Sequence, residues 1–208
     1  MKYIPEKREI DLRKKITNAL DKFALDFLGI IKKHTEYVVI SGYVSILLGR
    51  SRATEDIDVF IKKITKEQFL KLYQELLKEE FWCINEDNGN ELFEYLGENM
   101  AIRFCRKNSP IPNFEIKFPK DSLDEKSFKD SINVLLSDGE IKISSLERHI
   151  AFKEIYLGSE KDIEDSEHIR ELFKESLDYE KINKLKELVR IRKEHERKKA
   201  EKNFYETW

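Results

Sequence analysis

Residues 38–61 read VVISGYVSILLGRSRATEDIDVFI and form the most informative stretch of the chain. A β-branched apolar run ends at Ser41-Gly42, which predicts a strand followed by a glycine turn. Asp56-Ile57-Asp58 then begins a second apolar run. Residues two apart in a strand share a face, so both carboxylates project together while Ile57 faces the core. The stretch therefore predicts two strands that carry a turn and a carboxylate pair.

A glycine turn and a carboxylate pair suit the chemistry of phosphates and metal ions. Backbone N–H groups after such a turn bind phosphate, and paired carboxylates that repel each other are stabilised by a hard cation such as Mg²⁺. The twelve residues 44–55 allow a short helix and a return loop, so the turn and the pair can meet at one sheet edge. Arg50 and Arg52 in this loop are candidate phosphate contacts. The alternatives are an acidic strand end facing water, and ion pairs of the arginines with Glu55 or Asp56.

Composition describes a globular protein with a heavily charged surface. The chain has 208 residues, of which 40% are hydrophobic and 38% charged, with a net charge of −2. Cys83 and Cys105 are far apart and form no CxxC pair, so we expect buried free thiols in a reducing compartment. The N-terminus has no apolar signal segment, and no stretch is long and apolar enough for a membrane span. These features predict a cytoplasmic protein that does not bind membranes.

Hydrophobic periodicity predicts a mixed sheet region followed by helices. We expect an α+β fold with an α/β domain over residues 1–143 and a C-terminal helical region over 144–208 that packs on it and ends in a charged tail, 190–208. Two capping boxes, Thr65–Gln68 and Ser144–Glu147, begin helices. The predicted strands are 37–40, 57–61, 81–84, 101–105, 114–118 and 141–143, and the predicted helices are 10–33, 44–48, 65–80, 144–156, 162–175 and one from 179 onward.

The last predicted helix is locally basic. Residues 181–202 hold ten Lys or Arg against four Glu, a balance of +6. Such a segment can contact the phosphates of a nucleic acid. A solvated helix surface has the same composition, and both interpretations stay open.

The motifs resemble the signature of the DNA polymerase beta-type nucleotidyltransferase superfamily. That signature has an apolar residue, Gly, and Gly or Ser, then about a dozen residues, then Asp-apolar-[Asp/Glu]-apolar, and a third acidic residue on a later strand. The matching pieces are Ile40–Gly42, Asp56–Val59 and Phe114-Glu115-Ile116. The stretch GRSRATEDIDVF is similar to the prokaryotic branch that contains minimal nucleotidyltransferases and AbiE-type abortive-infection toxins. The helical half matches that branch at Lys153, Lys161, Asp162 and Asp165.

The resemblance implies a nucleotidyltransferase-like mixed sheet flanked by helices and a Mg²⁺-dependent enzyme. Such an enzyme moves a nucleoside monophosphate from an NTP, such as ATP, to an acceptor hydroxyl on RNA (a tRNA 3′ end, for example), on a protein or on a small molecule. It further implies a toxin–antitoxin or defence component, with a partner protein. The implied catalytic and metal-binding residues are Asp56, Asp58 and Glu115, holding two Mg²⁺. The implied nucleotide-binding residues are Ser41, Gly42, Tyr43, Arg50, Arg52, Lys153 and Asp162.

Several of these residues have plainer interpretations. Glu115 also fits a surface carboxylate on a strand, and Lys117 shares its face, where it either neutralises charge at the site or forms a cross-strand ion pair. Lys153 also fits a solvated helix lysine, and Asp162 a carboxylate at a helix N-terminus.

The chain departs from the family pattern at one position. Gly42 is followed by Tyr43, where the family has Gly or Ser, and a bulky side chain there would crowd a triphosphate. Ser41 or Ser45 would then supply the missing hydroxyl. The departure supports an alternative function: a catalytically inert protein of this fold that binds a nucleotide or a partner protein.

Overall fold

A computed structural model describes the backbone of residues 1–206 and the side chains of residues 1–202. Residues 207–208, the end of the predicted tail, lie outside the described residues. The chain forms two compact units, Met1–Ser145 and Leu146–Trp208. Each is described by itself.

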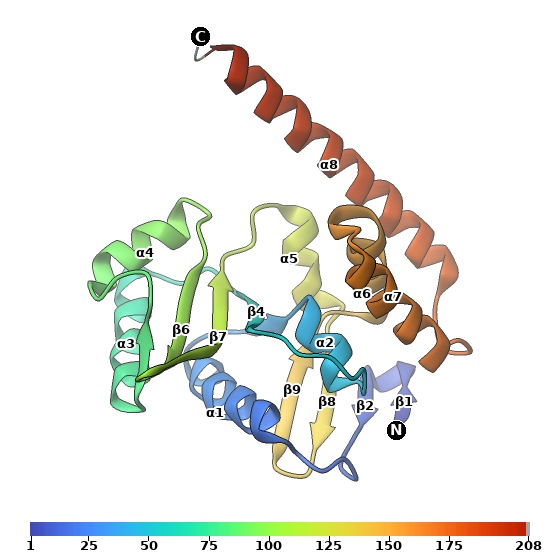
Figure 1. The fold of residues 1–208 in the computed structure, drawn as a ribbon, viewed down its shortest axis with the longest axis horizontal. Helices are drawn as coiled ribbons and strands as arrows, with labels where there is room; N and C mark the ends of the chain where they lie inside the picture. The colour runs from blue at the N-terminus through green and yellow to red at the C-terminus, as the bar shows by residue number, and fades with distance from the viewer. Residues whose placement is uncertain (207–208) are drawn as a thin grey trace. The chain divides into compact units, whose positions relative to one another are not determined.

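The first unit is built on one mixed sheet, which has nine strands within the described chain (Figure 1). Their order across the sheet is β1-β2-β8-β9-β3-β4-β7-β6-β5. Strand β4 lies inside the sheet, where it pairs antiparallel with β3 and parallel with β7. The strand bounds are β1 Lys2–Ile4, β2 Glu9–Asp11, β3 Tyr37–Val39, β4 Asp56–Ile61, β5 Phe81–Cys83, β6 Ile102–Arg106, β7 Ser109–Lys117, β8 Ile132–Leu136 and β9 Gly139–Ile143.

Aromatic side chains hold helix α1 against one face of this sheet. The ring of Phe27 in α1 stacks on Phe114 of β7 with 3.9 Å between centroids, and it also contacts Phe81 and Phe104. Stacked and edge-on rings add to the free energy gained by burying their area. The helices of this unit are α1 Ala19–His34, α2 Gly42–Leu47, α3 Lys66–Lys78, α4 Gly89–Gly97 and α5 Ser122–Lys129, with a 3₁₀ turn, η1, at Pro5–Lys7.

The predicted fold class is confirmed, but the first predicted helix begins too early. Helix α1 starts at Ala19, where Asn18 and Asp21 form a capping box. Glu9–Asp11 instead pairs in parallel with β8 as strand β2. Ile16, which the periodicity assigns to the helix, is 91% exposed. The helical spacing of Ile16 with the later apolar residues was accidental. Ile16 lies in the loop between β2 and α1. The pairing of β2 with β8 joins distant segments, so the local sequence does not reveal it.

The elements that were not predicted are all short: strands β1, β2 and β8, helices α4 and α5, and the 3₁₀ turn η1. The side chains of Asn88 and Asp121 cap the N-termini of α4 and α5. The capping box at Thr65–Gln68 is confirmed at the start of α3. Cys83 and Cys105 are buried and free of disulfides, as expected.

The second unit is helical. Its elements are α6 Leu146–Ala151, a π-helical segment η2 at Phe152–Leu157, α7 Glu160–Leu172 and α8 Tyr179–Glu206. Gly158 ends η2 in a left-handed conformation with φ of 72°, the usual way for a glycine to terminate a helix. Ile182, Leu185 and Val189 supply the buried side of α8. No helix among the described residues is long and apolar enough to cross a bilayer.

Candidate functional site

Strand register brings three carboxylates to one face of the sheet. Asp58 of β4 lies opposite Glu115 of β7, and Asp56 lies opposite Asn113. Ile57 between the two aspartates is fully buried on the other face, whereas Asp56 and Asp58 are half-buried. This is the alternation that the Asp-apolar-Asp pattern predicts.

The glycine turn reaches the same sheet edge. Strand β3 runs antiparallel to β4, and the backbone N–H of Ile40 donates to the carbonyl of Asp58 at 2.9 Å. Ser41 and Gly42 follow directly, beside the beginning of β4. The expectation that turn and carboxylates meet is therefore confirmed.

Ser41 occupies the strained position of the turn. Its φ of 61° and ψ of −142° lie in a region that residues with a Cβ rarely adopt. Its side chain is half-buried, while that of Ser45 is fully buried. Of these two serines, only Ser41 offers a hydroxyl at the surface of the turn.

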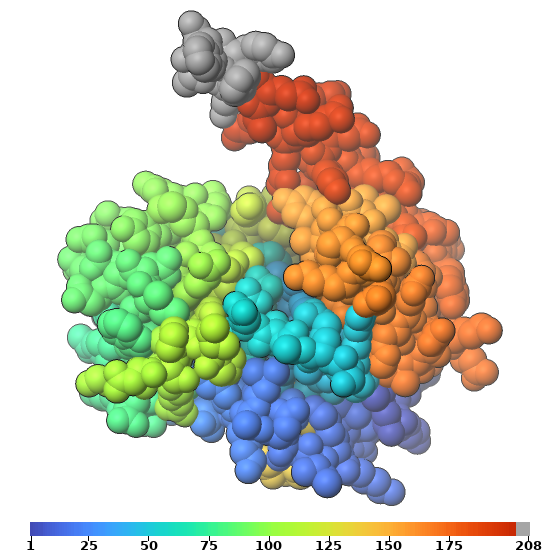
Figure 2. All heavy atoms as spheres, in the orientation of Figure 1, coloured from blue at the N-terminus to red at the C-terminus, as the bar shows by residue number. Residues whose placement is uncertain are grey.

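Gly42 permits the close approach of Arg52. A Cβ on residue 42 would overlap the guanidinium of Arg52, whose Cζ would lie only 3.3 Å away. Arg52 also donates from Nη1 to the carbonyl of Ala53 at 3.1 Å. The return loop that carries Arg50 and Arg52 lies at the surface beside the β6–β7 hairpin (Figure 2), where the carbonyl of Glu55 accepts from the backbone N–H of Asn113 at 2.9 Å.

Tyr43 points away from the turn. Its side chain is fully buried, and its hydroxyl donates to Asp21 Oδ1 at 3.0 Å. Burial raises the pKa of this phenol, with the neighbouring Asp21 charge adding to the effect. The side chain therefore does not crowd the space over Gly42, and a contact of residue 43 with a nucleotide would use its backbone amide.

Two cations contact two of the three carboxylates, Asp58 and Glu115. Lys117 Nζ lies 2.9 Å from Asp58 Oδ1 and 2.9 Å from Glu115 Oε1. Arg103 of β6 holds the other oxygen, with Nη2 2.8 Å and Nε 3.1 Å from Glu115 Oε2. Sequence reasoning predicted that Lys117 shares the face of Glu115, but it missed Arg103, whose place depends on the β6–β7 register.

The contacts among Lys117, Arg103 and the carboxylates determine the charge states of Glu115 and Lys117. Burial opposes the ionised form of Glu115, but the charges and hydrogen bonds of Lys117 and Arg103 outweigh it and lower the pKa of Glu115. Burial likewise opposes the charge on Lys117, yet Asp58 and Glu115 raise its pKa. At neutral pH the ion pairs are therefore fully charged.

Asn113 contributes an oxygen without a partner to the same face. Its Nδ2 donates to the carbonyls of Glu55 at 3.1 Å and Pro110 at 3.5 Å, which fixes the orientation of the amide. Its Oδ1 is buried and has no hydrogen-bond partner in the described part of the chain. Leaving a buried carbonyl unpaired costs about 1–3 kcal/mol, so Asn113 is an additional candidate for the site, which the sequence did not reveal.

The donor set fits one divalent cation. Asp56 has no ion pair among the described residues; its carboxylate accepts only a long hydrogen bond, 3.4 Å, from Thr54. Asp58 keeps one oxygen outside the contact with Lys117. Two carboxylates together with substrate phosphates are a common Mg²⁺ site. The described residues contain no group of three His, Cys, Asp or Glu side chains that could hold a metal ion. Both carboxylate oxygens of Glu115 already contact cations.

Lys153 and Asp162 meet in the second unit. Lys153 Nζ lies 2.7 Å from Asp162 Oδ1 and 2.9 Å from Asp165 Oδ2, and the side chain of Lys153 is only 3% exposed. Lys153 is therefore not a solvated helix lysine. Asp162 also forms the capping box of α7 with Ser159, so its interpretation as a carboxylate at a helix N-terminus is confirmed, while its nucleotide-binding role remains a prediction.

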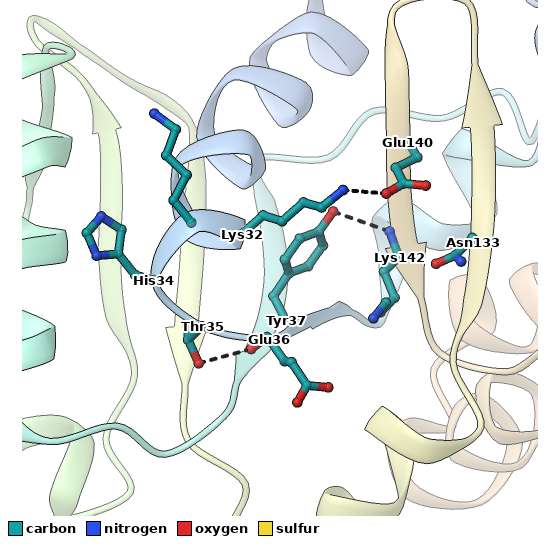
Figure 3. A pocket seen from close by; sticks show the side chains of 9 residues that line it. Lys32, His34, Thr35, Glu36, Tyr37, Asn133, Glu140 and Lys142 are labelled. Atoms are coloured by element: carbon teal, nitrogen blue, oxygen red, sulfur yellow. Dashed lines mark hydrogen bonds and ion pairs between the residues drawn. The ribbon is translucent and has the colours of Figure 1, made fainter.

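A separate pocket lies at the other end of β3. It has a volume of about 440 Å³ and is lined by the end of α1, by Tyr37 of β3, by Asn133 of β8 and by the charged residues Glu140 and Lys142 of β9 (Figure 3). Lys32 pairs with Glu140, and the Tyr37 hydroxyl accepts from the backbone N–H of Lys142 at 3.4 Å. Lys33 and His34 pair with Glu75. Because Lys32, Lys33 and His34 each already contact a carboxylate, whereas Asp56 has no ion pair in the described residues, the carboxylate face is the stronger candidate.

Comparison with known proteins gives likenesses of fold. No protein-family model matches the chain, and no curated protein matches it. A nucleotidyltransferase-like antigenic protein from Paracoccidioides brasiliensis is 17% identical, with a TM-score of 0.49 over 81% of this chain and 86% of that one. The antibiotic-resistance factor ANT(2'')-Ia is 13% identical, with a TM-score of 0.48 over 90% of this chain and 100% of that one.

Proposed function

We propose that this protein is a Mg²⁺-dependent nucleotidyltransferase, which moves a nucleoside monophosphate from an NTP to an acceptor hydroxyl. One observation carries the proposal. The carboxylates of Asp56, Asp58 and Glu115 share one sheet face, directly beside the Ser41-Gly42 turn with Arg52 against it.

Each part of the face has a task in this reaction. Arg52 and the backbone at Gly42 bind the NTP phosphates. Asp56 and Asp58 would hold Mg²⁺, which when bound would supply positive charge to the phosphates and to the attacking oxygen. Glu115 holds Arg103 on one oxygen and shares Lys117 with Asp58 on the other. The acceptor oxygen forms a bond to the α-phosphorus, and the bond between the α-phosphorus and the oxygen that bridges to the β-phosphorus breaks. Pyrophosphate leaves with the electron pair of that bond. The proton of the acceptor hydroxyl passes to water.

The sequence motifs extend the proposal to a biological role. By resemblance to the AbiE-type branch, the acceptor is RNA such as a tRNA 3′ end, and the protein acts as a toxin or defence component with a partner protein. Ser41, Arg50, Lys153 and Asp162 remain proposed nucleotide contacts on the same ground. A protein acceptor and a small-molecule acceptor are the other outcomes of the test below.

Label transfer tests the proposal. Purified protein is incubated with each α-labelled NTP, Mg²⁺ and total RNA or cell lysate, beside Asp56→Asn and Asp58→Asn variants. We expect a labelled product with the unaltered chain and a loss of at least about hundredfold in either variant. Glu98→Gln, which removes an exposed carboxylate at the end of α4, is the matched control and should keep full activity.

The outcomes separate the two functions. Nucleotide binding that depends on Asp56 without any labelled acceptor would favour the inert, nucleotide-binding alternative. Transfer that persists in both Asp→Asn variants would reject the proposed site.

A further inference from the structure

The ammonium group of Lys117 already bridges two of the three carboxylates. It lies 2.9 Å from Asp58 Oδ1 and 2.9 Å from Glu115 Oε1. The arrangement follows from the sheet, because Asp58 and Glu115 are register partners and Lys117 stands two residues further along the same face. The lysine thus takes the bridging position between neighbouring strands.

Distances oppose a metal ion in that bridge. An ammonium contacts carboxylate oxygens at 2.9 Å here, whereas Mg²⁺ requires oxygens at about 2.0–2.1 Å. A metal ion between Asp58 and Glu115 would require Lys117 to leave and the two carboxylates to approach each other. Arg103 opposes this approach, because it holds Glu115 Oε2 from β6.

The charge balance of the face gives the same result. Three carboxylates and the two cations Lys117 and Arg103 leave a net charge of −1. One divalent ion would bring this face to +1, and a second would bring it to +3 beside Lys117 before any substrate phosphate is counted. Asp56, whose carboxylate has no ion pair within the described chain, is the natural ligand for that single ion.

We propose that Lys117 takes the place of a second divalent cation, so that this site binds one divalent ion, on Asp56 and Asp58. The inference rests on the proposed function and narrows it. The sequence resemblance implies a site for two divalent ions. In the proposed one-ion site, the ammonium group of Lys117 on β7 takes the place of the second ion.

Counting bound Mn²⁺ tests the inference without measuring activity. Mn²⁺ is titrated into the protein with a non-hydrolysable NTP analogue, and the free ion is followed by electron paramagnetic resonance. We expect one Mn²⁺ per chain for the unaltered protein and for Lys117→Arg, which keeps the charge. Lys117→Met should bind a second Mn²⁺, with at least about tenfold tighter affinity than any second ion in the unaltered chain.

Arg103→Met is the matched control. It removes a cation from Glu115 but leaves Lys117 in the bridge, so the count should stay at one. Two Mn²⁺ on the unaltered chain would overturn the inference while leaving the proposed function intact, and so would a count of one in folded Lys117→Met. If Lys117→Met does not fold, the count on the unaltered chain decides. Binding of neither Mn²⁺ nor the analogue would reject both proposals.

Discussion

At residue 43, a buried tyrosine hydroxyl donates to Asp21, whose other oxygen accepts from Lys15 and from the backbone N–H of Asn18. Tyr43→Phe removes one hydrogen bond to a charged group, so we expect a loss of about 1–2 kcal/mol in the free energy of unfolding. Affinity for an NTP analogue should not change, because the side chain faces the core. Urea unfolding and calorimetric titration measure the two effects. Weaker binding at unchanged stability would show instead that Tyr43 faces the ligand.

At residue 42, the absent Cβ makes room for Arg52. Gly42→Ala should displace this flexible guanidinium, change stability by less than about 1 kcal/mol, and weaken binding of the NTP analogue about tenfold. Calorimetric titration of the analogue measures the affinity. Unchanged affinity would remove Arg52 from the proposed phosphate contacts.

Gly29 provides the control for that substitution. It lies within α1, and an added Cβ there would meet nothing within 4 Å. Gly29→Ala should therefore leave binding unchanged and raise stability by up to about 1 kcal/mol, because alanine favours helices over glycine.

Among the elements, η2 and α7 are joined by the buried contacts of Lys153 with Asp162 and Asp165. Lys153→Met would remove the ammonium group that contacts two buried carboxylates, which we expect to cost about 3 kcal/mol or more in the free energy of unfolding. Lys161→Met, at an exposed position of α7, should change stability by less than about 0.5 kcal/mol. Urea unfolding compares the two variants. A Lys153 variant that keeps its stability but loses nucleotide affinity would support the nucleotide-binding role instead.

A second contact between these elements predicts a pH dependence. Burial opposes the charge of Glu154, but hydrogen bonds from Arg170, Lys186 and Ser166 lower its pKa to about 2, below the ordinary 4.5. A lowered carboxylate pKa stabilises the fold above the ordinary value, and the stabilisation is lost as the pH falls from about 4.5 toward 2. After allowance for solvent screening, this is worth about 1–2 kcal/mol.

Urea unfolding of the unaltered chain and of Glu154→Gln at pH 6 and pH 3 measures that contribution. The stability difference between the two proteins should be largest at pH 6 and should shrink at pH 3. A difference that stays constant with pH would mean that the ion pairs of Glu154 contribute nothing.

Element boundaries show where local sequence is sufficient. The capping box at Thr65–Gln68 and the glycine stop at Gly158 lie within a few residues of the helix ends they control, so they were predictable. Strand β2 was not predictable in this way, because it forms by pairing with β8, more than a hundred residues away. Its residues were therefore assigned to a helix.

At the scale of the whole molecule, the basic segment is partly neutralised within its own unit. In the described part of the chain, at least six of its ten basic residues form ion pairs with glutamates, namely Lys181, Lys184, Lys186, Arg190, Arg192 and Arg197. These pairs favour the interpretation of a solvated helix face. The nucleic-acid interpretation stays a prediction for the remaining lysines.

The end of α8 offers a test of how the second unit is stabilised. The described side chains from Arg197 to Lys202 are all exposed. A chain that ends after Glu196 should therefore keep its free energy of unfolding within about 0.5 kcal/mol. Val189→Ala, at a fully buried position of the same helix, should cost about 2 kcal/mol. A larger loss on truncation would reveal stabilising contacts of the tail.

The sequence by itself determined the mixed α/β class and the alternation that places Asp56 and Asp58 on one face, because both depend on periodicity within a few residues. It also predicted that the turn of Ser41 and Gly42 reaches this face. Tertiary structure alone decided that Tyr43 is buried on Asp21, that Arg103 joins Glu115, and that Lys117 bridges two strands. These contacts depend on the register between strands, and register is set by packing across the whole sheet.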